Sequence, residues 1–139
     1  YKNVVGLGMN QIELEANSRL SSYLIHNLAI NPKLPFVNNS FDACTLTVSV
    51  QYIVHPISVF QEIGRVLRPN RPCIVSFSNR CFPTKAVSIW HQLSDMGHAQ
   101  LVTHYFDGSG VFDPPETADI SPNGGKTDPL IVVCAKSKN

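Results

Sequence analysis

The middle of the chain, residues 43–77, switches between two periodicities, and this constrains the fold more than any other feature. Residues 43–50 and 73–77 are short runs rich in β-branched and small apolar side chains, which is typical of strands buried on both faces. Between them, His55-Pro56 opens a segment whose buried face is predicted from helical spacing: Ile57, Phe60, Ile63, Gly64 and Leu67. This order predicts two parallel strands joined by a right-handed crossover.

The flanking segments extend the same alternation. We predict further strands over residues 4–7, 23–28, 99–106 and 130–135, with helices after Asn10 and from Pro83. Strands that alternate with helices indicate an α/β fold with a mostly parallel sheet. Because no helix is expected between the last two strands, they should pair antiparallel at one edge. Residues 107–128 are rich in Pro, Gly and Asp and are predicted to form a partly ordered excursion.

Charge and composition narrow the class of protein. The 139 residues suffice for one domain, and the net charge is +1 with no basic run, so we expect no nucleic-acid partner. The apolar runs are too short to span a membrane, so no membrane association is expected. The histidines at 91, 98 and 104 have no carboxylate at ligand spacing, so no metal site is expected.

Cysteine usage points to a reducing compartment. The four cysteines form no Cys-x-x-Cys pair, and Cys44, Cys73 and Cys134 fall inside predicted strands. Small buried thiols are the usual reading of such positions. We therefore expect an intracellular protein, either cytoplasmic or organellar.

Two stretches carry a resemblance to a known family. Residues 34–42, Leu-Pro-Phe-Val-Asn-Asn-Ser-Phe-Asp, resemble the "LPF-x-(D/N)-(N/G)-S-F-D" stretch of class I S-adenosylmethionine-dependent methyltransferases. Residues 60–70, Phe-Gln-Glu-Ile-Gly-Arg-Val-Leu-Arg-Pro-Asn, resemble their "E-x-x-R-V-L-(K/R)-P-G-G" transition from helix to strand. The order and separation also match, over residues 4 to about 80. The likeness is to the type 11 branch, in a plant- or alga-like subgroup whose fifth strand runs into Ser-Asn-Arg-Cys-Phe, here residues 78–82.

The resemblance implies a Rossmann-like, three-layer fold with a mostly parallel sheet and an antiparallel edge strand. It makes residues 4–7 the second strand of that fold, so we expect a single methyltransferase-like domain over 1–139 that is truncated at its N-terminus, without the first strand and glycine-rich loop. The family's strand order is 3-2-1-4-5-7-6, which makes the first strand central. We therefore expect an unpaired sheet edge there and self-association through it.

The resemblance also implies a site for S-adenosylmethionine at the carboxyl ends of the strands. Gly8 takes the place of the carboxylate that binds the ribose, with Asn10 nearby as either a cofactor contact or a helix N-cap. Asn27 takes the place of the carboxylate that binds the adenine amino group. The cofactor-binding candidates are thus Gly8, Asn10, Asn27, Leu28 and Ser49, and the substrate-side candidates are Gln51, Tyr52, Asn79 and Arg80.

These inferences predict methyl transfer from S-adenosylmethionine to a small molecule, with no catalytic residue assigned. A methyltransferase-like interaction module without catalysis is the alternative, because Gly8 and Asn27 replace two recognition carboxylates. A nicotinamide-binding loop at Gly6-x-Gly8 would need a third glycine near position 11, where Gln11 stands, and we set that class aside.

Overall fold

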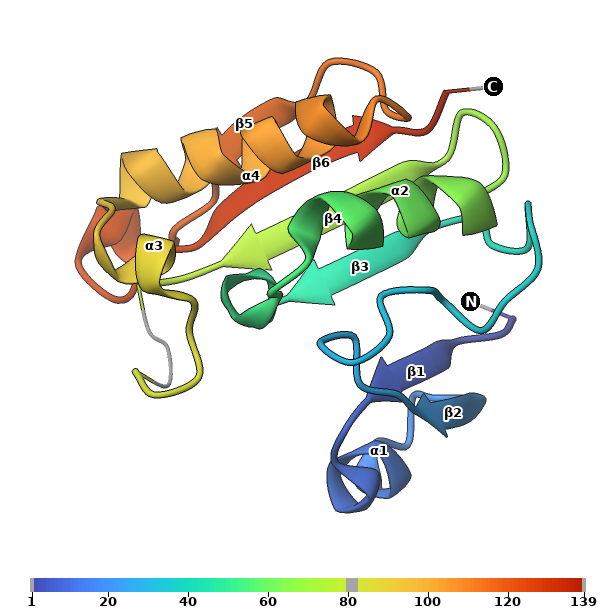
Figure 1. Cartoon of the computed structure of the whole chain (residues 1–139). Coiled ribbons are helices and arrows are strands. Elements are labelled where there is room, and N and C mark those ends of the chain that lie inside the picture. The colour runs from blue at the N-terminus through green and yellow to red at the C-terminus, as the bar shows by residue number, and fades with distance from the viewer. Residues whose placement is uncertain (1, 80–82, 139) are drawn as a thin grey trace.

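The computed structural model describes residues 2–79 and 83–138 (Figure 1). The strands are β1 (Val5–Gly8), β2 (Ser22–Ile25), β3 (Cys44–Thr47), β4 (Pro72–Phe77), β5 (Glu116–Asp119) and β6 (Ile131–Lys136). The α-helices are α1 (Gln11–Ala16), α2 (Pro56–Val66), α3 (Ser88–His91) and α4 (Asp95–Ser109), and the 3-10 helices are η1 (Val50–Tyr52) and η2 (Pro122–Gly125). In the described part of the chain, no helix is both long enough and apolar enough to cross a membrane.

The strands form two separate sheets. β1 pairs parallel with β2, and the second sheet has the order β3-β4-β6-β5, in which β3 and β4 are parallel and β6 is antiparallel to both its neighbours. The α/β class and the antiparallel pairing at one edge are therefore confirmed, as is the mostly parallel sheet, since β3, β4 and β5 run in one direction and β6 runs against them. The break between β1 and β3 falls where the family resemblance puts its first strand.

Helices α2 and α4 cover the same face of the four-stranded sheet (Figure 1). The alternation along β4 matches this arrangement, since Cys73, Val75 and Phe77 are buried whereas Ile74 is 36% exposed. The two helices pack through aromatic side chains. The ring centroids of Phe60 and Phe106 lie 4.9 Å apart in an edge-to-face contact. This layer forms the main core of the molecule.

The predicted strand over residues 99–106 is wrong, because these residues lie inside α4. Val102, Thr103, Tyr105 and Phe106 favour strands by propensity, but the buried positions of α4 recur at helical spacing. The helix also has clear ends: Ser94 Oγ accepts from Gly97 N at 3.2 Å, and Gly110 closes it at φ 74°. The antiparallel edge pair is formed instead by β5, from within the predicted excursion, and β6.

The helix predicted from Pro83 is also wrong in its start. Residues 83–87 form turns, and only Ser88–His91 are helical. Trp90 of α3 is buried, and its ring stacks on His98 of α4 with the centroids 3.8 Å apart.

One ion pair joins the two motifs that carried the family resemblance. Arg65 of α2 donates to both carboxylate oxygens of Glu62, at 2.7 and 2.9 Å. Its remaining N–H groups donate to the backbone oxygens of Leu34 and Phe36 and to Asn38 Oδ1. Glu62 in turn accepts from Leu34 N at 2.8 Å. The irregular segment before β3 is therefore fixed to α2 by charge-assisted hydrogen bonds.

The same segment docks on the end of α2 through its backbone. Phe41 N donates to Val66 O at 3.0 Å, and Arg68 N donates back to Phe41 O at 2.9 Å. Asn70 then turns the chain into β4 at φ 62°, a left-handed conformation that asparagine tolerates better than most residues. This explains how Asn70 can stand where the family pattern has glycine.

We predict that Arg65→Met lowers the free energy of unfolding by about 2 kcal/mol, because it leaves Glu62 and two backbone carbonyls without their partner. Urea denaturation at neutral pH measures this loss. Arg19→Met, at an exposed position on the loop before β2, is the matched control and should change stability little. Equal losses for the two variants would contradict the structural role of Arg65.

Acid should weaken the same interaction. The hydrogen bonds from Arg65 lower the pKa of Glu62 below its usual range. A carboxyl group with a depressed pKa in the folded state stabilises the protein above its unfolded pKa of about 4.3 and loses this contribution as the pH falls through the folded pKa. The stability difference between the wild type and Arg65→Met should therefore shrink in acid.

Candidate functional site

The candidate residues lie at the carboxyl ends of the parallel strands, in two groups. Gly8 ends β1, and Asn27 and Leu28 follow β2, its hydrogen-bonded neighbour. Ser49 to Tyr52 follow β3, and Asn79 follows β4, which pairs with β3. The structure thus brings the candidates together within each sheet. Arg80 lies outside the described residues.

The first strand end offers no carboxylate. Gly8 has no side chain, although a Cβ there would meet nothing closer than Leu14 Cδ1 at 3.7 Å, an ordinary contact. Asn10 is the N-cap of α1, and its Oδ1 accepts from Ile12 N at 3.1 Å and Glu13 N at 3.3 Å. Its acceptor is therefore used by the helix, which leaves only the amide N–H groups free to donate.

The second strand end keeps part of its binding capacity. Asn27 Oδ1 accepts from Ala29 N at 2.9 Å, in a local turn after β2. The amide retains one lone pair on Oδ1 and both N–H donors. Leu28 beside it packs against the core. A second oxygen lone pair and an apolar neighbour fit the amino group and ring of an adenine. Asn27 Oδ1 thus keeps a lone pair that can accept from an amino group, whereas Gly8 and the capping Asn10 offer no free side-chain acceptor for ribose hydroxyls.

The end of β3 has an unusual backbone. Val48 has φ 48°, a left-handed conformation that is rare for a β-branched residue. Its N–H still donates to Ser76 O on β4 at 2.8 Å, so the turn is anchored to the sheet. Ser49 is exposed, whereas Gln51 is fully buried at 0% exposure. Tyr52 is half-buried, and Asn79 is exposed.

Sequence reasoning missed two polar groups near this edge. Ser78 Oγ and His98 Nδ1 are buried and have no hydrogen-bond partner. His98 Nε2 lies 2.7 Å from Trp90 O, and its Nδ1 lies 3.9 Å from Asp95 Oδ1. No pattern of residue types marks these atoms, because their burial depends on the packing of α3 against β4 and α4.

Cys44, Cys73 and Cys134 lie in strands as predicted, and Cys81 lies outside the described residues. Cys44 and Cys73 are direct neighbours in the β3–β4 register, and Cys134 lies in β6. The hydrogen bond with Cys44 and burial raise the pKa of the Cys73 thiol well above its usual range. No three His, Cys, Asp or Glu side chains of the described residues are grouped so that they could hold a metal ion.

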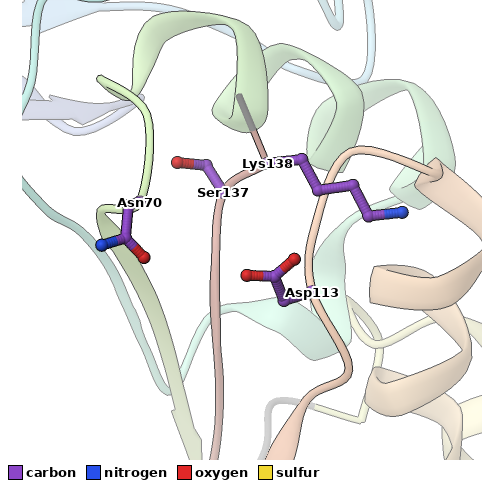
Figure 2. Close-up of a pocket in the computed structure, with 4 residues that line it drawn as sticks. All are labelled: Asn70, Asp113, Ser137 and Lys138. Atoms are coloured by element: carbon purple, nitrogen blue, oxygen red, sulfur yellow. The ribbon is translucent and has the colours of Figure 1, made fainter.

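Two hollows lie away from the candidate residues. Figure 2 shows one of about 440 Å³ lined by Asn70, Asp113, Ser137 and Lys138. Asn70 precedes β4, Ser137 and Lys138 follow β6, and Asp113 lies between α4 and β5 and donates its N–H to Lys136 O. The hollow is therefore at the amino end of β4, opposite the carboxyl ends of the parallel strands. A second hollow of about 320 Å³ is lined by residues of β5, β6 and the segments beside them. Neither coincides with the predicted site.

Comparison with known families decides the assignment. A family model described as a methyltransferase domain matches residues 2–75, which span β1 to β4 and more than half of the chain. The chain belongs to this methyltransferase family. The match includes Gly8, Asn27 and the turn after β3. No curated protein sequence matches the chain.

Solved structures share the fold at low sequence identity. A chain of the complex between a methyltransferase activator and a methyltransferase of Haloferax volcanii gives a TM-score of 0.69 at 16% identity, covering 99% of this chain and 73% of that one. An S-adenosylmethionine-dependent methyltransferase of Thermotoga maritima gives 0.66 at 16% identity, covering 98% and 73%. The cyclase SpnF gives 0.65 at 13% identity, covering 98% and 67%. These likenesses establish the Rossmann-like methyltransferase fold, and the chain spans about two thirds to three quarters of each.

Removing the side chain of Asn10 tests whether it serves α1. We predict that Asn10→Ala speeds amide exchange of Ile12 and Glu13 about fivefold, because the cap contributes about 1 kcal/mol. Asn10→Asp keeps an acceptor and should leave the exchange rates close to those of the wild type. Unchanged protection in Asn10→Ala would show that the side chain does not cap the helix.

Proposed function

We propose that this protein is an S-adenosylmethionine-dependent methyltransferase of a small molecule, with residues 1–139 forming a single methyltransferase-like domain. The observation that carries the proposal is the family match over residues 2–75, which ends within β4 and includes three of the strand ends that bear candidate residues. The cofactor carries its methyl group on a sulfonium, so the protein mainly has to orient the donor and the acceptor. A rigid sheet edge with side chains from several strands suits that task.

In this proposal the two groups of residues have different roles. Asn27 and Leu28 bind the adenine, Gly8 and Asn10 lie toward the ribose, and Ser49 borders the sulfonium. Gln51, Tyr52 and Asn79 face the acceptor, and Arg80, outside the described residues, stays a substrate-side candidate from the sequence alone. The likeness of residues 78–82 to a plant- or alga-like subgroup and the free thiols of Cys44, Cys73 and Cys134 support an intracellular member of the type 11 branch.

Calorimetric titration of the full chain with S-adenosylhomocysteine tests cofactor binding. We predict saturable binding that Asn27→Asp strengthens about fivefold, because a carboxylate accepts a stronger hydrogen bond from the adenine amino group. Asp can also accept from Ala29 N, so the local turn is kept.

Asn27→Leu should weaken binding about tenfold while the chain stays folded. Asn31→Asp, a few residues further along the same loop, is the charge-matched control and should leave the affinity close to that of the wild type. No heat at millimolar ligand would refute cofactor binding by this chain.

An interaction module without catalysis is the second candidate. It is favoured by the absence of a carboxylate side chain at Gly8 and by the use of the Asn10 acceptor in capping α1. The edge of β3 away from β4 has no strand partner among the described residues, and Thr45 and Thr47 on that strand are exposed. Unpaired strand edges favour association, and we propose that two copies pair through β3.

Sedimentation velocity tests that pairing. We predict a concentration-dependent dimer that the double variant Thr45→Lys/Thr47→Lys converts to a monomer, since lysines on an edge strand oppose pairing. Thr117→Lys, in the exposed strand β5 at the far edge, is the matched control. A monomer at all concentrations would exclude self-association through this edge.

A further inference from the structure

In the described part of the chain, the buried side-chain polar atoms without partners lie near one end of the four-stranded sheet. Among the described residues, such atoms belong to Gln51, Ser78 and His98. Gln51 follows β3, Ser78 directly follows β4, and His98 stacks on Trp90 of α3. A buried group that loses its water without gaining a partner destabilises the fold, so clusters of such groups need an explanation.

Gln51 is the most extreme of the three. Its side chain is fully buried, and neither Oε1 nor Nε2 has a hydrogen-bond partner. Its backbone oxygen accepts from Val87 N at 2.9 Å, so the segment that leads into α3 lies against this turn. A buried carboxamide without hydrogen bonds at either end destabilises the fold. An apolar side chain of similar size would be more stable at this position.

The backbone of the same turn is also held in an unfavourable conformation. Val48 lies three residues before Gln51 and adopts φ 48°, which brings its branched side chain close to its own backbone. Strain of this kind persists only where the surrounding structure imposes it, and it gathers at ligand-binding positions. The strained backbone and the orphaned amide are independent observations on one four-residue turn.

Ser78 supplies a second group at the same edge. Its Oγ is buried without a partner, and it stands one residue beyond β4, with which η1 is in contact. His98 Nδ1 also has no hydrogen-bond partner, since Asp95 Oδ1 lies 3.9 Å away. Gln51 and Ser78 follow the neighbouring strands β3 and β4, whereas His98 lies in α4, so the unused groups at the strand ends are the Gln51 carboxamide and the Ser78 hydroxyl.

We propose that the Gln51 carboxamide and the Ser78 hydroxyl position the methyl acceptor, which is an uncharged compound with a hydroxyl or amide group on an apolar body. This inference rests on the proposed function. In it, the segment leading into α3 moves from Gln51 to admit the acceptor. Gln51 Oε1 then accepts from the ligand, while Gln51 Nε2 and Ser78 Oγ donate to it.

The charge and polarity of the surroundings select this class of acceptor. Neither Gln51 nor Ser78 carries a charge, and burying a charged ligand against them without a counter-ion is costly. Apolar side chains flank the turn: Val48 is 38%, Val54 49% and Ile89 46% exposed. An apolar body can cover these side chains while its polar group reaches the amide.

Stability of the ligand-free chain provides the first test. Gln51→Met should raise the melting temperature by about 3–6 °C, because it removes a buried amide that has no partner. Gln100→Met, the same exchange at an exposed glutamine of α4, is the matched control and should shift it little. A fall in melting temperature for Gln51→Met would show that the amide serves the fold and would overturn the proposal.

A matched pair of glycine variants tests the backbone strain at Val48. Val48→Gly should leave the melting temperature unchanged or higher, because relief of the left-handed strain offsets the added chain entropy. Thr47→Gly, the preceding residue in β3, should lower it by several degrees, as glycine does in strands. Equal losses for the two variants would contradict the strain at Val48.

Fluorescence of Trp90, the only tryptophan, reports binding beside the turn. Benzyl alcohol and benzamide are the uncharged probes, and benzoate and benzylammonium are their charged counterparts. The uncharged probes should change the fluorescence of the full chain at concentrations at least tenfold lower than the charged ones. Gln51→Met and Ser78→Ala should each weaken the uncharged probes about tenfold.

The outcomes separate this inference from the proposed function. If S-adenosylhomocysteine binds but the charged probes bind as well as the uncharged ones, the acceptor class is wrong and the methyltransferase assignment stands. If S-adenosylhomocysteine does not bind, the proposed function fails, while the probes and the Gln51→Met melting temperature still decide whether Gln51 and Ser78 form a ligand site. Probe binding that is equal in the wild type and Gln51→Met overturns the inference.

Discussion

The ion pair between Glu62 and Arg65 organises the part of the molecule that carries the candidate site. Arg65 makes five hydrogen bonds, three of them to the irregular segment before β3. A loop of this kind has no ladder of its own to satisfy its carbonyl groups, so a guanidinium with five donors in a fixed plane replaces the ladder. Because the loop is fixed to α2, β3 enters the sheet in one register, and the turn at its end is held in place.

The segment held by Arg65 and the strained turn at Val48 lie at opposite ends of β3. At the amino end of β3, Arg65 and Glu62 are paired with each other, and Glu62 also accepts from Leu34 N. Phe41 N there donates to Val66 O. At the carboxyl end, Val48 is strained and the Gln51 amide is unused. Satisfied polar groups stabilise a fold, and unsatisfied ones are retained where a ligand completes them. The groups at the amino end of β3 therefore stabilise the fold, and the groups at its carboxyl end serve the proposed chemistry.

The candidate cofactor residues follow from the sequence only in part. The motif around residues 34–42 and the helix-to-strand transition at 60–70 led to the correct family, and the strand ends put Gly8 and Asn27 on neighbouring strands. Asn10 and Asn27 are residues of a type that often caps helices and turns, which the sequence shows. Whether their side chains form these hydrogen bonds depends on local backbone geometry. Ser78 was recognised only as the first residue of the stretch 78–82, because only packing shows that its hydroxyl is buried without a partner.

The sequence by itself determined most of the alternation of strands and helices, the parallel pairing of β3 with β4 and part of the buried face of α2, because these follow from local periodicity. Phe60, Ile63 and Leu67 are buried as predicted, whereas Val59 and Val66 are buried without having been predicted. The prediction failed at residues 99–106, where β-branched and aromatic side chains suggested a strand. The tertiary structure decided for a helix, because α4 buries Val102 and Phe106 against the layer formed by α2 and the sheet. Only the tertiary structure likewise decided that Gln51 is buried without a partner, since burial is set by residues distant in the sequence such as Val87, and periodicity does not record them.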